Sequence, residues 1–344
     1  DIDRFATSGD DKFKALAAFY RDWYEDTLKA FRDRYGRDII GAFRQLQDGG
    51  YIEISTSAAT HGYLPLLSRD SSIVGQLRTG IHSYEEMFGR KPTAIWLPEC
   101  AYRPARAADA TPEGIGRPAI EEYLAKQGIK VFFSETHTVE GGKPVGKAAG
   151  EAIGPYGEVH RRFKEIGTGE LQETPGTTFK PYWVGNAAGQ VAVLGEVAVL
   201  GRNNRTGQQV WSGQFGYPGD AAYREFHRKD GVSGMQYWAI GGPGTDLGDK
   251  PLYDPAVAQE RVESHADHFS HLVEEQLREY REETGQAGVI ASNYDTELFG
   301  HWWFEGVAWL KGVLRRLASS DTVDLLSATE IVEQYEPDLV AELP

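Results

Sequence analysis

Short apolar runs alternate with longer helical patterns along the chain, and this alternation limits its fold more strongly than any other feature. In residues 10–35 and 70–88, apolar side chains recur at three- and four-residue steps, as they do on one face of a helix. The runs at 93–97, 129–134 and 289–291 are short and end in turn formers, which is typical of buried parallel strands. Repeated at intervals of roughly forty residues, the pattern predicts βα units wrapped into a parallel sheet.

We expect roughly six strands, about two fewer than a complete eightfold barrel contains. Besides the three runs above, the expected strands are 51–56, 323–326 and the near-duplicate runs 191–195 and 197–201. A helix with a cap at Asp254 and Pro255 leads into the 289–291 run, and a capping box at Ser327–Glu330 begins the last helix.

The chain divides into regions of different character. Residues 1–50 are expected to form a helical segment packed on a barrel domain that spans residues 51–344. Within that domain, residues 139–200 are rich in Gly, Pro and Thr and predict an irregular insertion, and residues 213–250 predict mobile loops. The first residue is Asp1 and the first strong pattern is already helical, so we expect a further N-terminal piece in the complete protein.

Composition restricts the classes of partner. The formal net charge of −15 argues against a nucleic-acid ligand, which requires concentrated Lys and Arg, and suits a neutral substrate. No apolar run approaches the ~20 residues of a membrane span, and no signal peptide is recognisable, so a cytoplasmic location is expected. The single cysteine, Cys100, excludes an internal disulfide and is expected to serve packing.

Two acidic residues follow short apolar runs. Glu99 comes just after Ile95–Leu97, and Asp295 comes shortly after Val289–Ala291. Because the carboxyl ends of parallel strands lie at one rim of a barrel, both side chains are expected at that rim. A pair of carboxylates with aromatic residues nearby suits the cleavage of a carbohydrate.

Each carboxylate also has a structural interpretation. Glu99 could pair with Arg103 in a loop, and Asp295 could cap the helix that follows it. As an acid, Asp295 would need its pKa raised by apolar neighbours, and Glu297 competes with it for that role.

The histidines suggest both binding and structural roles. His61 and His301 could contact a sugar hydroxyl, anchor a loop, or bind zinc together with Asp295. No pair of the three has the i, i+4 spacing of a helical zinc motif, so we predict no metal and no other cofactor. The solvated face of a helix is the expected place of three further histidines, His265, His268 and His271.

Several aromatic residues are candidates for stacking against pyranose rings, with core packing as the alternative for any one of them. They are Trp96, Trp211, Trp302 and Trp303, with Tyr217 near the tip of the loop at 213–220.

Four stretches together carry a family resemblance. They are residues 59–67 (ATHGYLPLL), 96–104 (WLPECAYRP), 215–219 with 223–230 (FGYPG and YREFHRKD), and 292–306 (SNYDTELFGHWWFEG). These stretches resemble glycoside hydrolase family 57, and most closely its 1,4-α-glucan branching group. The similarity covers most of the chain and weakens between 139 and 200.

The resemblance implies an incomplete (β/α)7 TIM-like barrel with helical insertions and a retaining reaction on α-glucans such as amylose, amylopectin and glycogen. It implies that Glu99 is the nucleophile, that Asp295 is the general acid/base, and that His61 contacts substrate. Trp211, Trp302 and Trp303 match aromatic residues of the family's substrate site. The family's loop tyrosine, which closes over the site, is expected within 139–190, with Tyr156 and Tyr182 as candidates and Tyr217 as a weaker third.

Two departures and several alternatives remain open. The family's first His-containing strand and part of its C-terminal helical domain have no counterpart here, so the activity of this polypeptide by itself is in question. An α-amylase or 4-α-glucanotransferase of the same family would share the two carboxylates. A catalytically silent glucan-binding homologue or a zinc-dependent polysaccharide deacetylase would differ in turnover or in metal content.

Overall fold

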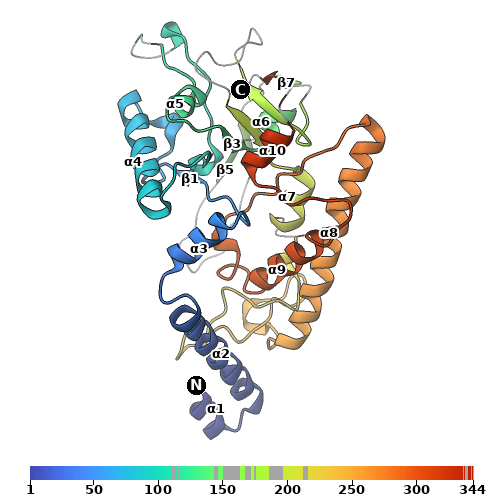
Figure 1. The fold of residues 1–344 in the computed structure, drawn as a ribbon. Coiled ribbons are helices and arrows are strands. Elements are labelled where there is room, and N and C mark those ends of the chain that lie inside the picture. Colours follow the sequence, from blue (N-terminus) through green and yellow to red (C-terminus); the bar gives the residue numbers. More distant parts are fainter. Residues whose placement is uncertain are drawn as a thin grey trace.

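The computed structural model of this protein describes most of the chain (Figure 1). The described residues are 1–110, 114, 116–142, 146–149, 163–166, 172–173, 176–185, 197–211, 216–335, 337, 340–341 and 343. The expectations that concern Tyr156 and the run at 191–195 lie outside these residues.

The central element is a sheet that, in the described part of the chain, has six strands in the order β1-β2-β3-β9-β8-β10. Its strands are β1 (Thr56–Ser57), β2 (Ala94–Trp96), β3 (Val131–Ser134), β8 (Pro181–Val184), β9 (Ala198–Gly201) and β10 (Val340–Ala341). All neighbours are parallel except β8 and β9. A parallel bridge between Arg202 and Ala291 brings a further segment to the end of β9.

Two antiparallel pairs stand outside this sheet: β4 (Gly141–Gly142) with β7 (Gln172–Glu173), and β5 (Gly146–Ala149) with β6 (Phe163–Ile166). The α-helices are α1 (Ile2–Ser8), α2 (Asp11–Lys29), α3 (Ile39–Asp48), α4 (Asp70–Phe88), α5 (Ile120–Lys126), α6 (Thr136–Glu140), α7 (Asn204–Trp211), α8 (Pro255–Thr284), α9 (Gly306–Leu317) and α10 (Ala328–Gln334). A π-helical turn (Ala30–Arg34) extends α2, and short 3-10 turns lie at Leu64–Leu66, Pro98–Cys100, Ala108–Ala110, Tyr217–Gly219, Leu247–Asp249 and Thr296–Leu298.

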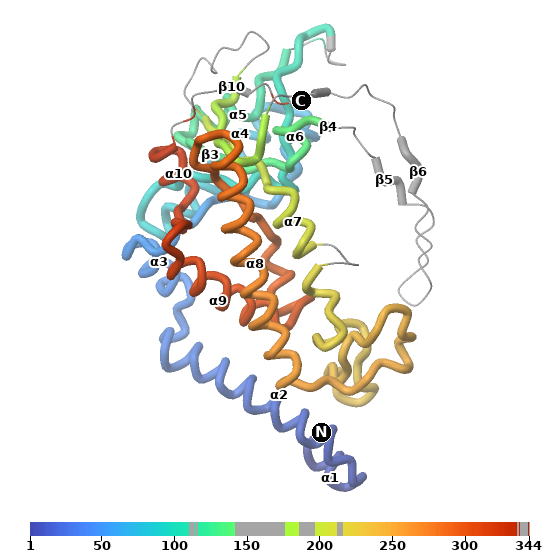
Figure 2. The backbone as a smooth tube through the Cα atoms, turned by 90° about the vertical axis from the view of Figure 1, so that its right-hand side faces the viewer, coloured from blue at the N-terminus to red at the C-terminus, as the bar shows by residue number. Residues whose placement is uncertain are grey.

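The helices are distributed unevenly around the sheet. Helices α4 and α5 lie on the side of β1, whereas α8 and α9 pack against each other along the other side (Figure 1). Figures 1 and 2 both place α1 and α2 at the end of the molecule farthest from the sheet. The N-terminal helices therefore form the base of the molecule, where Tyr20 of α2 packs against Phe304 with ring centroids 6.0 Å apart.

A close approach between α4 and β1 fixes the first strand end. A Cβ atom at Gly80 would lie 2.2 Å from the carbonyl oxygen of Ser57, so a larger residue would push the helix away from the strand. Gly80 thereby sets the position of the chain that leaves β1.

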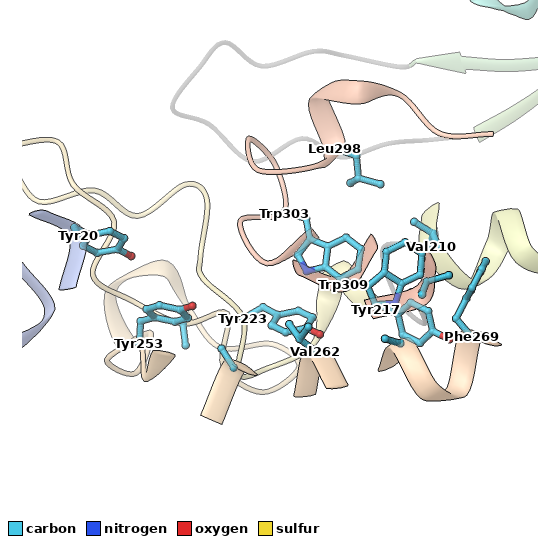
Figure 3. Packing of buried hydrophobic residues seen from close by; sticks show 14 of the residues in the cluster. Tyr20, Val210, Tyr217, Tyr223, Tyr253, Val262, Phe269, Leu298, Trp303 and Trp309 are labelled. Atoms are coloured by element: carbon cyan, nitrogen blue, oxygen red, sulfur yellow. The ribbon is translucent and has the colours of Figure 1, made fainter. Parts of the chain in front are cut away.

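The largest hydrophobic cluster lies between α8, α9 and the segment 217–253. Figure 3 shows Trp303 and Trp309 next to each other in this cluster, with Leu298 above them, and the centroids of the two tryptophan rings are 5.2 Å apart. A second cluster, around β2, β3 and β9, buries Ile95, Phe132 and Val199. The first cluster thus anchors the 296–305 segment, because it buries Leu298 and Trp303 of that segment.

The α/β class with a mostly parallel sheet confirms the expectation from the sequence. The strands are shorter than predicted, because the 51–56 run reaches the sheet only at Thr56. The expectation of a strand at 323–326 is wrong, since these residues have no strand assignment and line a groove beside α9 instead. No helix among the described residues is both long and apolar enough to cross a membrane.

The helical expectations at α2, α4, α8 and α10 are confirmed. Asp254 caps α8 by accepting hydrogen bonds from the backbone of Ala256 and Val257, and Ser327 and Glu330 form the expected reciprocal cap on α10. The division at residue 50, and the character given to 139–200 and 213–250, remain predictions.

Candidate active site

A cavity of about 710 Å³ lies where the parallel strands end. Five segments each supply one carboxylate, guanidinium or imidazole within four residues of the strand or bridge that precedes it. These are His61 after β1, Glu99 after β2, Glu135 after β3, Arg202 after β9 and Asp295 after the bridge at Ala291. Ser55, Trp96, Cys100, Trp211, Tyr294, Thr296, Glu297, Leu298 and Trp302 complete the lining. The size is that of a ligand-binding pocket, and its position is the catalytic end of a parallel barrel.

Glu99 occupies a strained turn at the end of β2. The turn Pro98–Cys100 holds Glu99 at φ 57° and ψ 24°, in the left-handed region that non-glycine residues rarely adopt. Its side chain is 68% exposed toward the cavity, and one carboxylate oxygen, Oε1, lies 3.2 Å from Nε2 of His61. Backbone strain of this kind is concentrated at functional sites.

Arg103 does not engage Glu99. Its guanidinium is buried and donates to the carbonyl oxygens of Pro104 and Pro118. The alternative in which Glu99 serves only a loop ion pair with Arg103 is therefore wrong.

His61 is also held in the left-handed region, with φ 54°. Gln76 of α4 fixes the turn before it, because its side-chain oxygen accepts from the backbone N–H of Thr60 and its amide donates to the Thr60 hydroxyl. The backbone N–H of Ala59 donates to the carbonyl oxygen of Gln76 as well. The imidazole is thus presented to Glu99 from a turn that α4 holds in place.

Asp295 precedes the 3-10 turn Thr296–Leu298 without capping it through its side chain. Its carboxylate is exposed and lines the cavity, so the capping interpretation of the sequence is wrong. The preceding Tyr294 anchors the segment by donating to the carbonyl oxygen of Thr206 in α7, and burial raises the pKa of Tyr294 to about 12. Glu297 lines the same cavity and remains a competitor for the role of acid.

Glu135 and Arg202 form an ion pair at the cavity that the sequence reading missed. The Nη2 atom of Arg202 lies 3.3 Å from Oε1 of Glu135, and both side chains are less than half exposed. Each follows an expected strand directly, so the rule that singled out Glu99 and Asp295 would have found them. Cys100 lines the same cavity. Burial raises the pKa of its thiol to about 12, the charges of Glu135 and Asp295 act in the same direction, and the thiol therefore stays protonated.

Three of the expected aromatic residues line the cavity. Trp211 ends α7 and is 41% exposed, and Trp302 is 51% exposed. Trp96 is half-buried at the end of β2 and packs against Phe133 with ring centroids 6.0 Å apart. These rings offer both exposed faces and a rigid wall to a bound molecule.

Two expected contacts are corrected by the structure. Trp303 is only 1% exposed and packs on Trp309, and the hydroxyl of Tyr217 lies 2.6 Å from Nδ1 of His268 while its ring is buried in the same cluster (Figure 3). Neither ring lines the cavity, because the hydrophobic cluster under the 296–305 segment takes both.

The remaining expected site residues lie elsewhere. His301 is exposed beside Trp302 and Phe226 and does not line the cavity, so it does not join His61 and Asp295 there. Tyr182, expected on a closing loop, is buried in β8, and its hydroxyl accepts a hydrogen bond from the backbone of Thr177.

The three helical histidines do not form one solvated face. His271 is well exposed, but the ring of His265 is largely buried, with Nδ1 2.8 Å from the Tyr223 hydroxyl. In the described ranges no three His, Cys, Asp or Glu side chains come together in a way that could hold a metal ion.

A comparison with protein families identifies the family of this chain. The model of glycosyl hydrolase family 57 matches residues 3–344, which includes all five segments that supply the cavity. The chain belongs to glycosyl hydrolase family 57.

Proteins named as enzymes are among the relatives of this chain. The chain is 47% identical over 300 residues to the 1,4-alpha-glucan branching enzyme TK1436 of Thermococcus kodakarensis, an alignment that covers 87% of this chain and 40% of that protein. The crystal structure of TK1436 in complex with glucose and additives matches the whole of this chain and 57% of its own, with a TM-score of 0.80 and 41% identity. The lower identity belongs to the alignment by structure, which extends over the complete chain.

Two further solved structures have the same fold. The branching enzyme of Pyrococcus horikoshii matches 97% of this chain and 54% of its own, with a TM-score of 0.77 and 40% identity. The α-amylase AmyC of Thermotoga maritima matches 96% of this chain and 57% of its own, with a TM-score of 0.73 and 28% identity. This chain thus spans about half the length of the relatives that it matches.

Proposed function

We propose that this family 57 chain carries the catalytic centre of a 1,4-α-glucan branching enzyme. The observation that carries the proposal is that Glu99 and Asp295, 196 positions apart in the sequence, line one cavity together with exposed tryptophans. The similarity to two branching enzymes at 40–47% identity supports branching above the other activities of the family. Glycogen, amylopectin and amylose remain the expected substrates, and the cytoplasm remains the expected compartment.

The proposed reaction has two steps with retention of configuration. In the first, a carboxylate oxygen of Glu99 attacks the anomeric carbon of an α-1,4-linked glucose unit while the carboxylic acid of Asp295 protonates the glycosidic oxygen. The C1–O bond breaks and the distal chain leaves as an alcohol. In the second, the 6-hydroxyl of another glucan chain attacks the same carbon, Asp295 accepts its proton and Glu99 is released.

His61 and Arg202 support the proposed roles of the carboxylates. The 3.2 Å contact between His61 and Glu99 orients the attacking carboxylate, and loss of this contact would widen its range of positions. Arg202 places a guanidinium at the cavity, paired there with Glu135, where it can donate hydrogen bonds to a sugar hydroxyl.

Transfer to a glucan rather than to water requires a shielded intermediate. The cavity is open enough that Glu99 and His61 are more than half exposed, so shielding must come from the bound glucan or from a segment that closes over it. Of the three tyrosines expected for such closure, Tyr182 and Tyr217 are buried, and Tyr156 lies outside the described residues and remains a candidate.

Product analysis tests the proposed activity. The protein is incubated with amylose and the products are examined by methylation analysis or proton NMR for new 1,6-linked units. Branching predicts new 1,6 linkages with little rise in reducing ends. A rise in reducing ends alone would favour the α-amylase activity of the relative from Thermotoga maritima, and new 1,4 products alone would favour a 4-α-glucanotransferase.

Three variants test the residue assignments. Glu99→Gln is expected to reduce the rate by roughly 10⁴-fold, and Asp295→Asn by about 10²–10⁴-fold. Glu297→Gln is the matched control, because Glu297 lines the same cavity two residues after Asp295. A full loss in Glu297→Gln with activity retained in Asp295→Asn would reverse the assignment of the acid.

A further inference from the structure

We propose that four rings at the edge of the cavity form a binding surface for the part of an α-glucan chain that extends beyond the catalytic carboxylates. The rings belong to Phe226, His227, His301 and Trp302, and we call them the rim platform. The inference rests on the proposed action on α-glucans and adds a second determinant to it, namely a preference for long chains over short oligosaccharides.

Trp302 connects the rim platform to the cavity. It lines the cavity and remains 51% exposed, while Phe226 covers part of it at a centroid distance of 4.2 Å and an interplanar angle of 33°. His301 meets the indole edge-on at 5.5 Å, and His227 lies 6.5 Å from it. The four rings therefore form one continuous surface that begins inside the cavity and ends outside it.

The segment that carries Phe226 and His227 is held rigidly from below. Glu225 is buried and accepts hydrogen bonds from the backbone N–H of His227 and from its ring, and it also pairs with Lys250 at 3.2 Å. The side-chain amide of Gln236 donates to the carbonyl oxygen of Phe226. These bonds fix the backbone of Phe226 and both the backbone and the ring of His227 before any ligand arrives, which reduces the entropy lost on binding.

A sugar chain suits this surface better than an apolar partner does. The rings of His227 and His301 are exposed and carry nitrogen atoms that can hydrogen-bond to hydroxyl groups, while Phe226 and Trp302 offer apolar faces of the kind that stack on pyranose rings. The cavity itself has the size of a pocket for a small ligand, so a long chain bound at Glu99 has to continue over its edge. Trp302 lies at this edge and offers an aromatic surface to a chain that leaves the cavity.

Binding by chains of two lengths tests the inference. Glu99→Gln serves as the background so that no turnover occurs, and the dissociation constants of maltotriose and maltodecaose are measured by calorimetry. His227→Ala and Phe226→Ala in this background are expected to weaken maltodecaose binding by about 3–10-fold, with maltotriose binding unchanged. His227 is the safer site for folding, because its side chain is 70% exposed.

Tyr24→Ala is the matched control, since Tyr24 is also 51% exposed but lies on α2, away from the cavity. It is expected to leave both dissociation constants unchanged. Equal weakening of both ligands by His227→Ala would place the ring in the cavity itself, and no weakening of either would remove it from binding; both results overturn the rim platform.

The outcomes also separate this inference from the proposed activity. Absence of 1,6 linkages together with a length-dependent loss in His227→Ala would reject branching and keep the rim platform. New 1,6 linkages together with unchanged length dependence in both variants would keep branching and reject the platform.

Discussion

The Nε2 atom of His61 lies 3.2 Å from Oε1 of Glu99, and both residues have positive φ angles, 54° and 57°. Each residue therefore sits in a backbone conformation that costs free energy in a non-glycine residue, and the two turns aim their side chains at each other. The conformations persist because α4 holds one turn through Gln76 and Gly80, and the sheet holds the other through β2.

Loss of the His61 side chain should lower catalysis more than it lowers binding. His61→Asn keeps a residue type that tolerates the left-handed conformation and removes the imidazole, so kcat on amylose should fall about 10–100-fold with a smaller change in KM. His82→Asn, at an exposed histidine of α4, is the control. A rise in KM with kcat unchanged would show that His61 only binds substrate.

Strain at Glu99 can be measured by comparing glycine with alanine. Because φ is positive there, Glu99→Gly should be more stable than Glu99→Ala by about 1 kcal/mol in denaturant unfolding. The same pair at Glu297, which has no positive φ, should show the reverse order by about 0.5–1 kcal/mol. The same order at both positions would mean that the turn at Glu99 relaxes without cost.

Two adjacent tryptophans should respond differently to truncation. Trp303→Ala removes a ring that is 1% exposed in the core and should destabilise the protein by about 3–5 kcal/mol. Trp302→Ala should change stability by much less and weaken glucan binding instead, because its ring is half exposed at the cavity. Thermal unfolding and calorimetric titration of both variants with a maltooligosaccharide check this contrast.

Acid should weaken the fold through His265. Burial, together with the positive charge of Arg261 and the nearby His268, lowers the pKa of His265 to about 4, although Asp220 acts in the opposite direction. The unfolded chain, with an ordinary pKa of 6.5, therefore binds a proton that the folded protein excludes. Stability is present above about pH 6.5 and is lost progressively as the pH falls toward 4, by about 1–3 kcal/mol from this group.

His265→Gln should reduce this pH dependence, measured as the difference in unfolding free energy between neutral and acid solution. His271→Gln is its control, since His271 lies on the same helix with an exposed ring. The hydroxyls of Tyr223 and Tyr217 also face this part of α8, but both have pKa values raised by burial and stay protonated throughout the range. Identical slopes for wild type and His265→Gln would exclude His265 as the source.

Periodic elements with a cap at one end were predictable from the sequence. The 30-residue helix α8, Pro255–Thr284, begins at the expected Asp254–Pro255, because the cap and the proline agree with the helical pattern that follows. The convergence of Glu99 and Asp295 was predictable as well, since parallel strands end at one rim and each acid follows a strand-like run.

Burial of individual aromatic residues was not predictable in the same way. Trp302 and Trp303 are neighbours in a turn without a helical or strand period, so nothing local indicates which one faces the core. Likewise, the sequence of the helix predicts a solvated position for His265. Its ring is largely buried because Tyr217 and Tyr223, from a segment distant in the sequence, pack against it. Such features depend on which segments pack together, and that information is absent from a local pattern.

The pairing of Ala94 with Val131 and of Ile95 with Phe132 sets how far Glu99 projects above its neighbour strand. A slip of one residue between these strands would displace the carboxylate by about 3.3 Å and turn the inward side chains of β2 outward. Insertions inside the strands should therefore abolish chemistry, whereas lengthening the loops beyond the strand ends should alter only which chains are accepted. We therefore expect proteins of this fold to differ in substrate specificity through their loops, while the lengths of their strands stay constant.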